Sequence, residues 1–187
     1  MEQIKEEIDL WQRARVFAWV FGLFALCLPL VAMQFTEEVN WSLGDFIVFG
    51  GMLAGVGILF ELAARSTKNT GYRIGVGLAL LGAFLLTWAN LAVGIIGNEN
   101  NEANVLYFGL LLLGFIGALV VRFKPSGMAF VMAAVTVLLI MIAAFALFLG
   151  LGSSSPTWPR GIVVATVLLG ALWIGSALCF RKAGRES

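Results

Sequence analysis

Four residues in the apolar runs of this chain, or beside them, form a candidate ion or proton site: Glu61, its expected partner Arg65, Thr87 and Asn90. Glu61 is the only carboxylate well inside an apolar run, where a charge costs about 2.5–3.5 kcal/mol by insertion scales. Arg65 follows one helical turn later and predicts an ion pair near the inner membrane surface. The alternative is a Glu61 that faces a water-filled crevice as a protonatable or cation-coordinating group, with Thr87 and Asn90 lining the same interior.

Asn90 also has a purely structural interpretation. A polar side chain in the interior of a membrane helix commonly forms a hydrogen bond to a neighbouring helix, worth about 0.6–2 kcal/mol. We expect Asn90 to make such an interhelical bond.

The segment 98–104 holds a second group of polar side chains, with Glu99 and Glu102 among four asparagines. Carboxylate and amide oxygens suit Ca²⁺ or Mg²⁺, but the segment lacks the acidic spacing and the turn glycine of an EF-hand. We therefore predict no metal site and interpret the segment as a solvated outer loop that attracts cations. Gly97 is expected to end the preceding helix, and Asn101 or Asn104 to cap the next one.

Several chemistries lack their usual residues in this chain. It has no histidine, and its two cysteines, Cys27 and Cys179, are far apart in the sequence, so the usual ligands of haem, of an iron–sulfur cluster and of tetrahedral zinc are missing. Every lysine lies outside the apolar runs, which leaves no amine for a buried Schiff base. No nucleophile stands beside a base, and no glycine-rich loop cradles a phosphate. We predict no catalytic residue and no cofactor, and the residues do not favour an enzyme.

The elements that position the polar residues are six long apolar runs. Residues are 60% hydrophobic and 12% charged, against about 25% charged in soluble domains. A bilayer core about 30 Å thick needs about 20 apolar residues in a helix, and the runs show no strand-like alternation. The sequence thus predicts an all-α polytopic bundle with six spans, which in chain order are Val16–Met33, Phe46–Ala64, Ile74–Gly97, Val105–Val121, Met128–Leu151 and Ile162–Phe180.

The basic residues predict the orientation of the spans. An even number of spans places both termini on one side, and that side holds every lysine and arginine except Arg160. Because basic flanks are retained in the cytoplasm, we expect both termini to be cytoplasmic and the protein to lie in the cytoplasmic (inner) membrane. The expected partners are the lipid bilayer and either further copies of the chain or other membrane subunits, and no nucleic acid, since a basic surface for one is absent.

The whole chain, 1–187, is expected to form one integral membrane domain. Ile4, Ile8 and Trp11 recur at helical spacing ahead of the first span, so residues 1–15 are compatible with a short amphipathic helix on the inner surface or with a frayed tail.

Small residues at helical spacing predict where helices pack. Helices in lipid associate through close backbone contact, which small side chains permit. The second span places such residues on one face, and the third span does the same; the residues are Gly50, Ala54, Gly57, Gly75 and Gly82. The sequence Ser42, Leu43, Gly44, Asp45 has the pattern of a capping box at the start of the second span.

The stretch from Trp88 through Gly97 and Asn104 to Phe108 resembles a group of uncharacterised bacterial six-span inner-membrane proteins. The resemblance covers mainly residues 88–108 and implies no activity and no functional residue.

Two functions of different class fit these residues. The first is a non-catalytic membrane component, either a subunit of a larger complex or a self-associating scaffold, which the small-residue faces favour. The second is a small cation or proton channel or transporter that uses an inward-facing Glu61, with the acidic outer loop concentrating cations.

Overall fold

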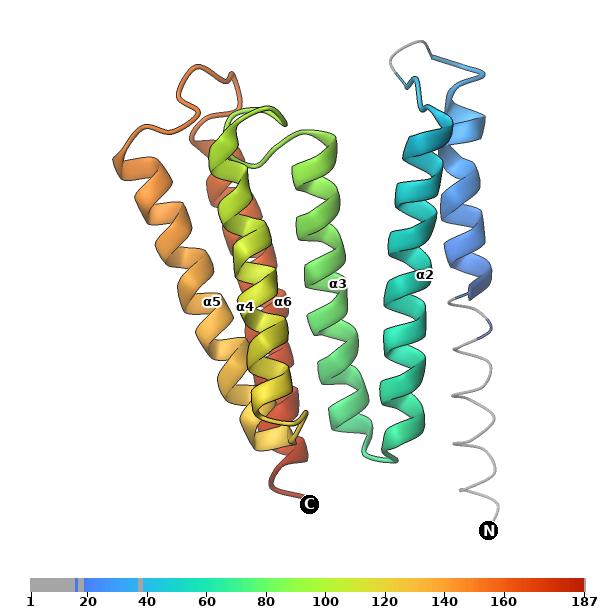
Figure 1. Cartoon of the computed structure of the whole chain (residues 1–187), viewed down its shortest axis with the longest axis vertical. Coiled ribbons are helices and arrows are strands. Elements are labelled where there is room, and N and C mark those ends of the chain that lie inside the picture. The colour runs from blue at the N-terminus through green and yellow to red at the C-terminus, as the bar shows by residue number, and fades with distance from the viewer. Residues whose placement is uncertain (1–15, 17–18, 37–38, 187) are drawn as a thin grey trace. The chain divides into compact units, whose positions relative to one another are not determined.

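The computed structural model describes residues 16, 19–36 and 39–186, and over these residues the fold is helical (Figure 1). A short apolar helix, Trp19–Ala32, comes first. The remaining elements, in chain order, are α2 (Leu43–Ser66), α3 (Thr70–Ala92), the single 3₁₀ turn η1 (Glu102–Asn104), α4 (Val105–Val120), α5 (Pro125–Phe148) and α6 (Arg160–Ala183).

Within the described residues, five helices are long and apolar enough to cross a membrane: α2, α3, η1 with α4, α5 and α6. They correspond to the second to sixth predicted spans, most with ends within a few residues. The first predicted span, Val16–Met33, corresponds to the shorter helix Trp19–Ala32. The surface helix predicted for residues 1–15 lies outside the described residues.

The third span ends earlier than predicted, at Ala92 instead of Gly97. Gly94 takes a left-handed conformation with φ +69°, and its N–H bonds the carbonyl of Ala89 at 3.0 Å, which closes the helix. Ile95 and Ile96 then fold back into the core, with exposed fractions of 7% and 0%. Hydropathy alone does not separate apolar residues that extend a helix from apolar residues buried in a loop, which explains the error.

The start of α2 has the predicted capping box. The N–H of Ser42 donates to Asp45 Oδ2 at 2.7 Å, and the N–H of Asp45 donates to Ser42 Oγ at 3.3 Å. These reciprocal bonds satisfy amides that have no partner within the helix.

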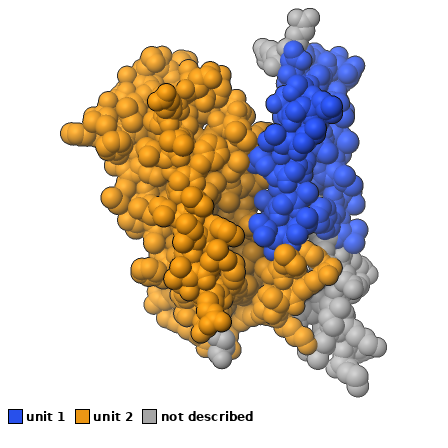
Figure 2. Space-filling view, in the orientation of Figure 1, with its two compact units in different colours: residues 1–59 blue, residues 60–187 orange. Residues whose placement is uncertain are grey.

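The described chain divides into two compact units, Met1–Leu59 (unit 1) and Phe60–Ser187 (unit 2) (Figure 2). In unit 1 the helix Trp19–Ala32 packs on α2 at two of the small residues. A Cβ atom on Gly57 would lie 2.8 Å from the ring of Trp19, and one on Gly50 would lie 3.7 Å from Leu26. The expectation of a single membrane domain over 1–187 stays a prediction.

Unit 2 is a bundle of α3, α4, α5 and α6 (Figure 1). α3 packs on α6, α6 on α5 and α5 on α4, whereas α3 and α4 meet much less extensively. The segments 93–104 and 149–159 lie at one end of the bundle, which we call the loop end. The connections 67–69 and 121–124 lie at the other end, which we call the turn end.

Aromatic rings of α6 fill the places that glycines of α3 leave open. A Cβ on Gly82 would lie 2.5 Å from Trp173 Nε1, and one on Gly75 would lie 3.1 Å from the ring of Phe180. Trp173 and Phe180 are 2% and 0% exposed. Any side chain at these two glycines would therefore push α3 and α6 apart.

Hydrogen bonds from side chains to backbone carbonyls of other elements fix the same packing. Ser176 Oγ donates to the carbonyl of Gly75 at 2.7 Å, and Trp173 Nε1 donates to that of Ala79 at 3.3 Å. At the turn end, the hydroxyl of Tyr72 donates to the carbonyl of Phe123 at 2.8 Å. Phe123 follows α4 with a positive φ of 56°, so Tyr72 holds a strained turn in place.

Gly82→Ala should destabilise the protein by about 1–3 kcal/mol, because the added methyl group must displace a buried indole. The measurement is thermal unfolding of the purified protein in detergent, followed by tryptophan fluorescence. Gly109→Ala is the matched control, since a Cβ there meets nothing within 4 Å and alanine is the better helix former. Equal stability of Gly82→Ala and the wild type would contradict the packing described for α3 and α6.

Candidate functional site

Glu61 and Arg65 form the predicted ion pair near the end of α2. Arg65 Nε donates to Glu61 Oε1 at 2.8 Å, and the exposed fractions of the side chains are 70% for Arg65 and 15% for Glu61. The spacing of four residues puts both on one face of the helix. The Glu61 side chain is thus largely buried while that of Arg65 is mostly exposed, which is the arrangement expected of a snorkelling arginine.

Thr87 and Asn90 donate hydrogen bonds to backbone carbonyls of their own helix, α3. Thr87 Oγ1 donates to the carbonyl of Ala83 at 2.8 Å, and Asn90 Nδ2 donates to that of Leu86 at 3.1 Å. The expected interhelical bond of Asn90 is therefore wrong, because its amide nitrogen turns back along α3. Its Oδ1 atom is buried without a hydrogen-bond partner.

The pair Glu61 and Arg65 on α2 and the pair Thr87 and Asn90 on α3 lie at different depths along the helices. Asn90 comes twenty residues after Thr70, the first residue of α3, which places it about 30 Å along the helix at 1.5 Å per residue. Glu61 is five residues from the end of α2 at Ser66, or about 8 Å along that helix. Because the 67–69 connection joins these ends, Glu61 lies toward the turn end and Asn90 toward the loop end. One ion cannot contact both side chains at once.

The acidic residues of the loop end are solvent-facing. Glu99 and Glu102 are exposed, and Glu99 Oε1 accepts a hydrogen bond from Asn100 Nδ2 at 3.2 Å. Among the described residues, no three His, Cys, Asp or Glu side chains gather as a metal site would require.

Asn104 holds the loop in a way that the sequence did not reveal. Its Oδ1 accepts from the N–H of Ile96 at 2.9 Å, and its Nδ2 donates to the carbonyls of Ile96 and Asn98 at 3.3 and 2.7 Å. Asn104 is 4% exposed. The helix-capping role belongs to Asn101, whose Oδ1 accepts from the N–H of Ala103 at 3.0 Å. Asn104 instead stabilises the loop by hydrogen bonding to its backbone.

The two segments of the loop end also touch each other through glycines. A Cβ on Gly97 would lie 3.0 Å from Cα of Gly152, and both residues have positive φ, 79° and 76°. Only glycine fits such a conformation and such a close approach without strain.

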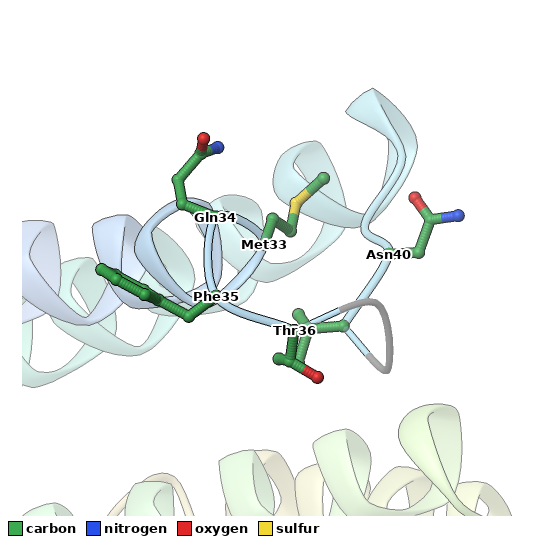
Figure 3. Close-up of a pocket in the computed structure, with 6 residues that line it drawn as sticks. Met33, Gln34, Phe35, Thr36 and Asn40 are labelled. Carbon is green, nitrogen blue, oxygen red and sulfur yellow. The ribbon is translucent and has the colours of Figure 1, made fainter.

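A hollow of about 720 Å³ lies in unit 1 at the segment that connects the helix Trp19–Ala32 to α2 (Figure 3). It is lined by Met33, Gln34, Phe35, Thr36, Val39 and Asn40. Its described lining residues supply amides and a hydroxyl and carry no charge.

Comparisons with protein-family models, with curated proteins and with solved structures find no significant match to this chain. The class of this protein is therefore inferred from the residues and helices of the chain itself. Five helices of membrane-spanning length and apolar composition define a multi-pass helical membrane protein.

Asn104→Ala should destabilise the loop end by about 1–3 kcal/mol, because it leaves the backbone groups of Ile96 and the carbonyl of Asn98 without their buried partner. Asn100→Ala is the control, since Asn100 is exposed and bonds only within the loop. Thermal unfolding and hydrogen exchange at the Ile96 amide measure the effect. Unchanged protection of that amide in Asn104→Ala would refute this stabilising role of Asn104.

Proposed function

We propose that this chain is an inner-membrane protein with six spans and both termini in the cytoplasm, and that it acts as a non-catalytic membrane component. In this role it is a subunit of a larger complex or a self-associating scaffold. Its membership of the group of bacterial inner-membrane proteins that residues 88–108 resemble belongs to the same proposal.

One observation carries the proposal: the polar side chains that cross between elements of unit 2 are engaged in holding the bundle together. Ser176, Trp173 and Tyr72 each donate to a backbone carbonyl of a different element. Such bonds build a rigid apolar body. A rigid body suits a component that presents its surface to others better than a carrier that must change shape.

The outward faces of unit 2 support the same role. Large apolar side chains cover them on three helices, and the most exposed include Val120 on α4, Phe130 and Phe148 on α5 and Val167 on α6. Such faces meet lipid tails or the helices of another membrane subunit equally well.

Native mass spectrometry of the tagged protein, extracted from its own membrane in mild detergent, tests this proposal. We expect either a second polypeptide in stoichiometric amount or a defined multiple of the 20.1 kDa chain. The first result identifies a subunit and the second a self-associating scaffold. A lone monomer at native expression would contradict both.

The alternative function is a cation or proton channel or transporter that uses Glu61. The observation in its favour is a carboxylate with only 15% of its side chain exposed on an apolar helix, which is the usual signature of a functional group in a membrane.

Glu61→Gln should leave proton and small-cation flux in proteoliposomes unchanged if the scaffold proposal is correct. If the alternative is correct, the wild type conducts and Glu61→Gln falls to the level of protein-free liposomes, because glutamine neither ionises nor exchanges a proton. Glu102→Gln is the matched control, since it removes an exposed loop carboxylate. Wild-type flux that only Glu61→Gln abolishes would overturn the scaffold proposal.

A further inference from the structure

Two side chains in the core of unit 2 end in polar atoms that have no hydrogen-bond partner among the described residues: Oδ1 of Asn90 and the hydroxyl of Tyr107. The residues are 3% and 0% exposed. Leaving such an atom unpaired costs about 1–3 kcal/mol, and buried polar groups in folded proteins nearly always have a partner. The two groups therefore point to a ligand.

The contacts between α3 and α6 give the depth of Asn90. These helices are antiparallel, and Gly82 lies against Trp173. Asn90 is eight residues from Gly82 toward the loop end, and Ala165 is eight residues from Trp173 in the same direction. Asn90 is therefore level with Ala165.

The contacts between α4 and α5 give the depth of Tyr107. Gly114 lies against Val135, since a Cβ on Gly114 would be 3.1 Å from Val135 Cγ2. Seven residues further toward the loop end come Tyr107 on α4 and Ile142 on α5. Tyr107 is therefore level with Ile142.

The contact between α5 and α6 relates these two depths. Gly170 lies against Thr136, and six residues further toward the loop end Val164 on α6 is level with Ile142 on α5. The two polar side chains thus correspond to consecutive positions of α6, about 1.5 Å apart in depth. They enter the same layer of the core from α3 and α4, which contact each other much less extensively than α3 contacts α6 or α4 contacts α5.

No charged side chain is among the buried residues in the part of the chain that the structure describes. Tyr107 belongs to one buried cluster with Ile95, Ile96 and Leu110, while Glu99 and Glu102 are exposed. A charged ligand would have no counter-charge here and would pay a large desolvation cost. The ligand is therefore neutral.

The unpaired atoms of Asn90 and Tyr107 also define which hydrogen bonds the ligand must donate and accept. The hydroxyl of Tyr107 can donate or accept, and Asn90 Oδ1 can only accept. A hydroxyl group that accepts from Tyr107 and donates to Asn90 satisfies both. Trp158 Nε1 is a third buried atom without a partner among the described residues; it lies in the segment before α6, packs against the same cluster as Tyr107, and can only donate.

We propose that a neutral hydroxyl oxygen bridges Tyr107 and Asn90 in the core at the loop end, supplied either by a water molecule or by the hydroxyl head of a lipophilic molecule. Both sources offer the same hydroxyl chemistry. The site lies beside α3 and α4, which contact each other only sparsely.

The first test compares Tyr107→Phe with Tyr72→Phe in the purified full-length chain. These are the only two tyrosines, and Tyr72 has a hydrogen bond to Phe123. If Tyr107 is bonded to a ligand, both variants lose one hydrogen bond and unfold at a temperature lower by about 2–4 °C. A midpoint for Tyr107→Phe equal to or above that of the wild type would overturn the proposal.

The second test identifies the source. With ¹³C-labelled tyrosine, magnetisation transfer from water to Tyr107 Cζ, reduced in Asn90→Leu, identifies water. In native mass spectrometry, a neutral adduct that is lost in both Tyr107→Phe and Asn90→Leu identifies a lipophilic molecule. A destabilised Tyr107→Phe with neither signal indicates a direct bond from Tyr107 to Asn90, and that result also overturns the proposal.

Discussion

The close approach of α3 and α6 is the contact on which the rest of unit 2 depends. Between helices in lipid there is no water to expel, so association relies on tight packing and interhelical hydrogen bonds. Gly75 and Gly82 supply the tight packing by admitting the rings of Phe180 and Trp173. Ser176 and Trp173 then bond carbonyls of α3 that come within reach only at this separation. α6 packs in turn on α5, and α5 packs on α4.

The polar groups of unit 2 separate into two kinds of environment. Near the turn end, Glu61 and Arg65 form a charged pair in which the arginine is the more exposed side chain, an arrangement that gives the carboxylate a partner. At the loop end, Asn90 and Tyr107 are neutral and fully enclosed. The distance between these regions along the helices argues against one continuous site, and the proposed component role requires none.

Much of the architecture could be predicted from the sequence because span length and hydropathy are imposed by the bilayer itself. The capping box at Ser42 and Asp45 and the pairing of Glu61 with Arg65 are local, so spacing along one helix was sufficient to predict them. The error at the end of α3 arose because Ile95 and Ile96 have the same hydropathy in a loop as in a helix. The bonds of Ser176, Trp173 and Asn104 join residues whose meeting depends on register and loop path, which a single sequence does not contain.

The contact of Gly97 with Gly152 has a consequence for biosynthesis. The hairpin of α3 and α4 leaves the ribosome before that of α5 and α6, and Asn104 closes its loop with bonds from within the same hairpin. The hairpin of α5 and α6 then packs against a hairpin whose loop is already folded. In that step the backbone of Gly152 must come into direct contact with the backbone of Gly97. A side chain at either glycine would therefore obstruct the joining of the two hairpins, and it would also strain the loop that carries it, because both glycines have positive φ.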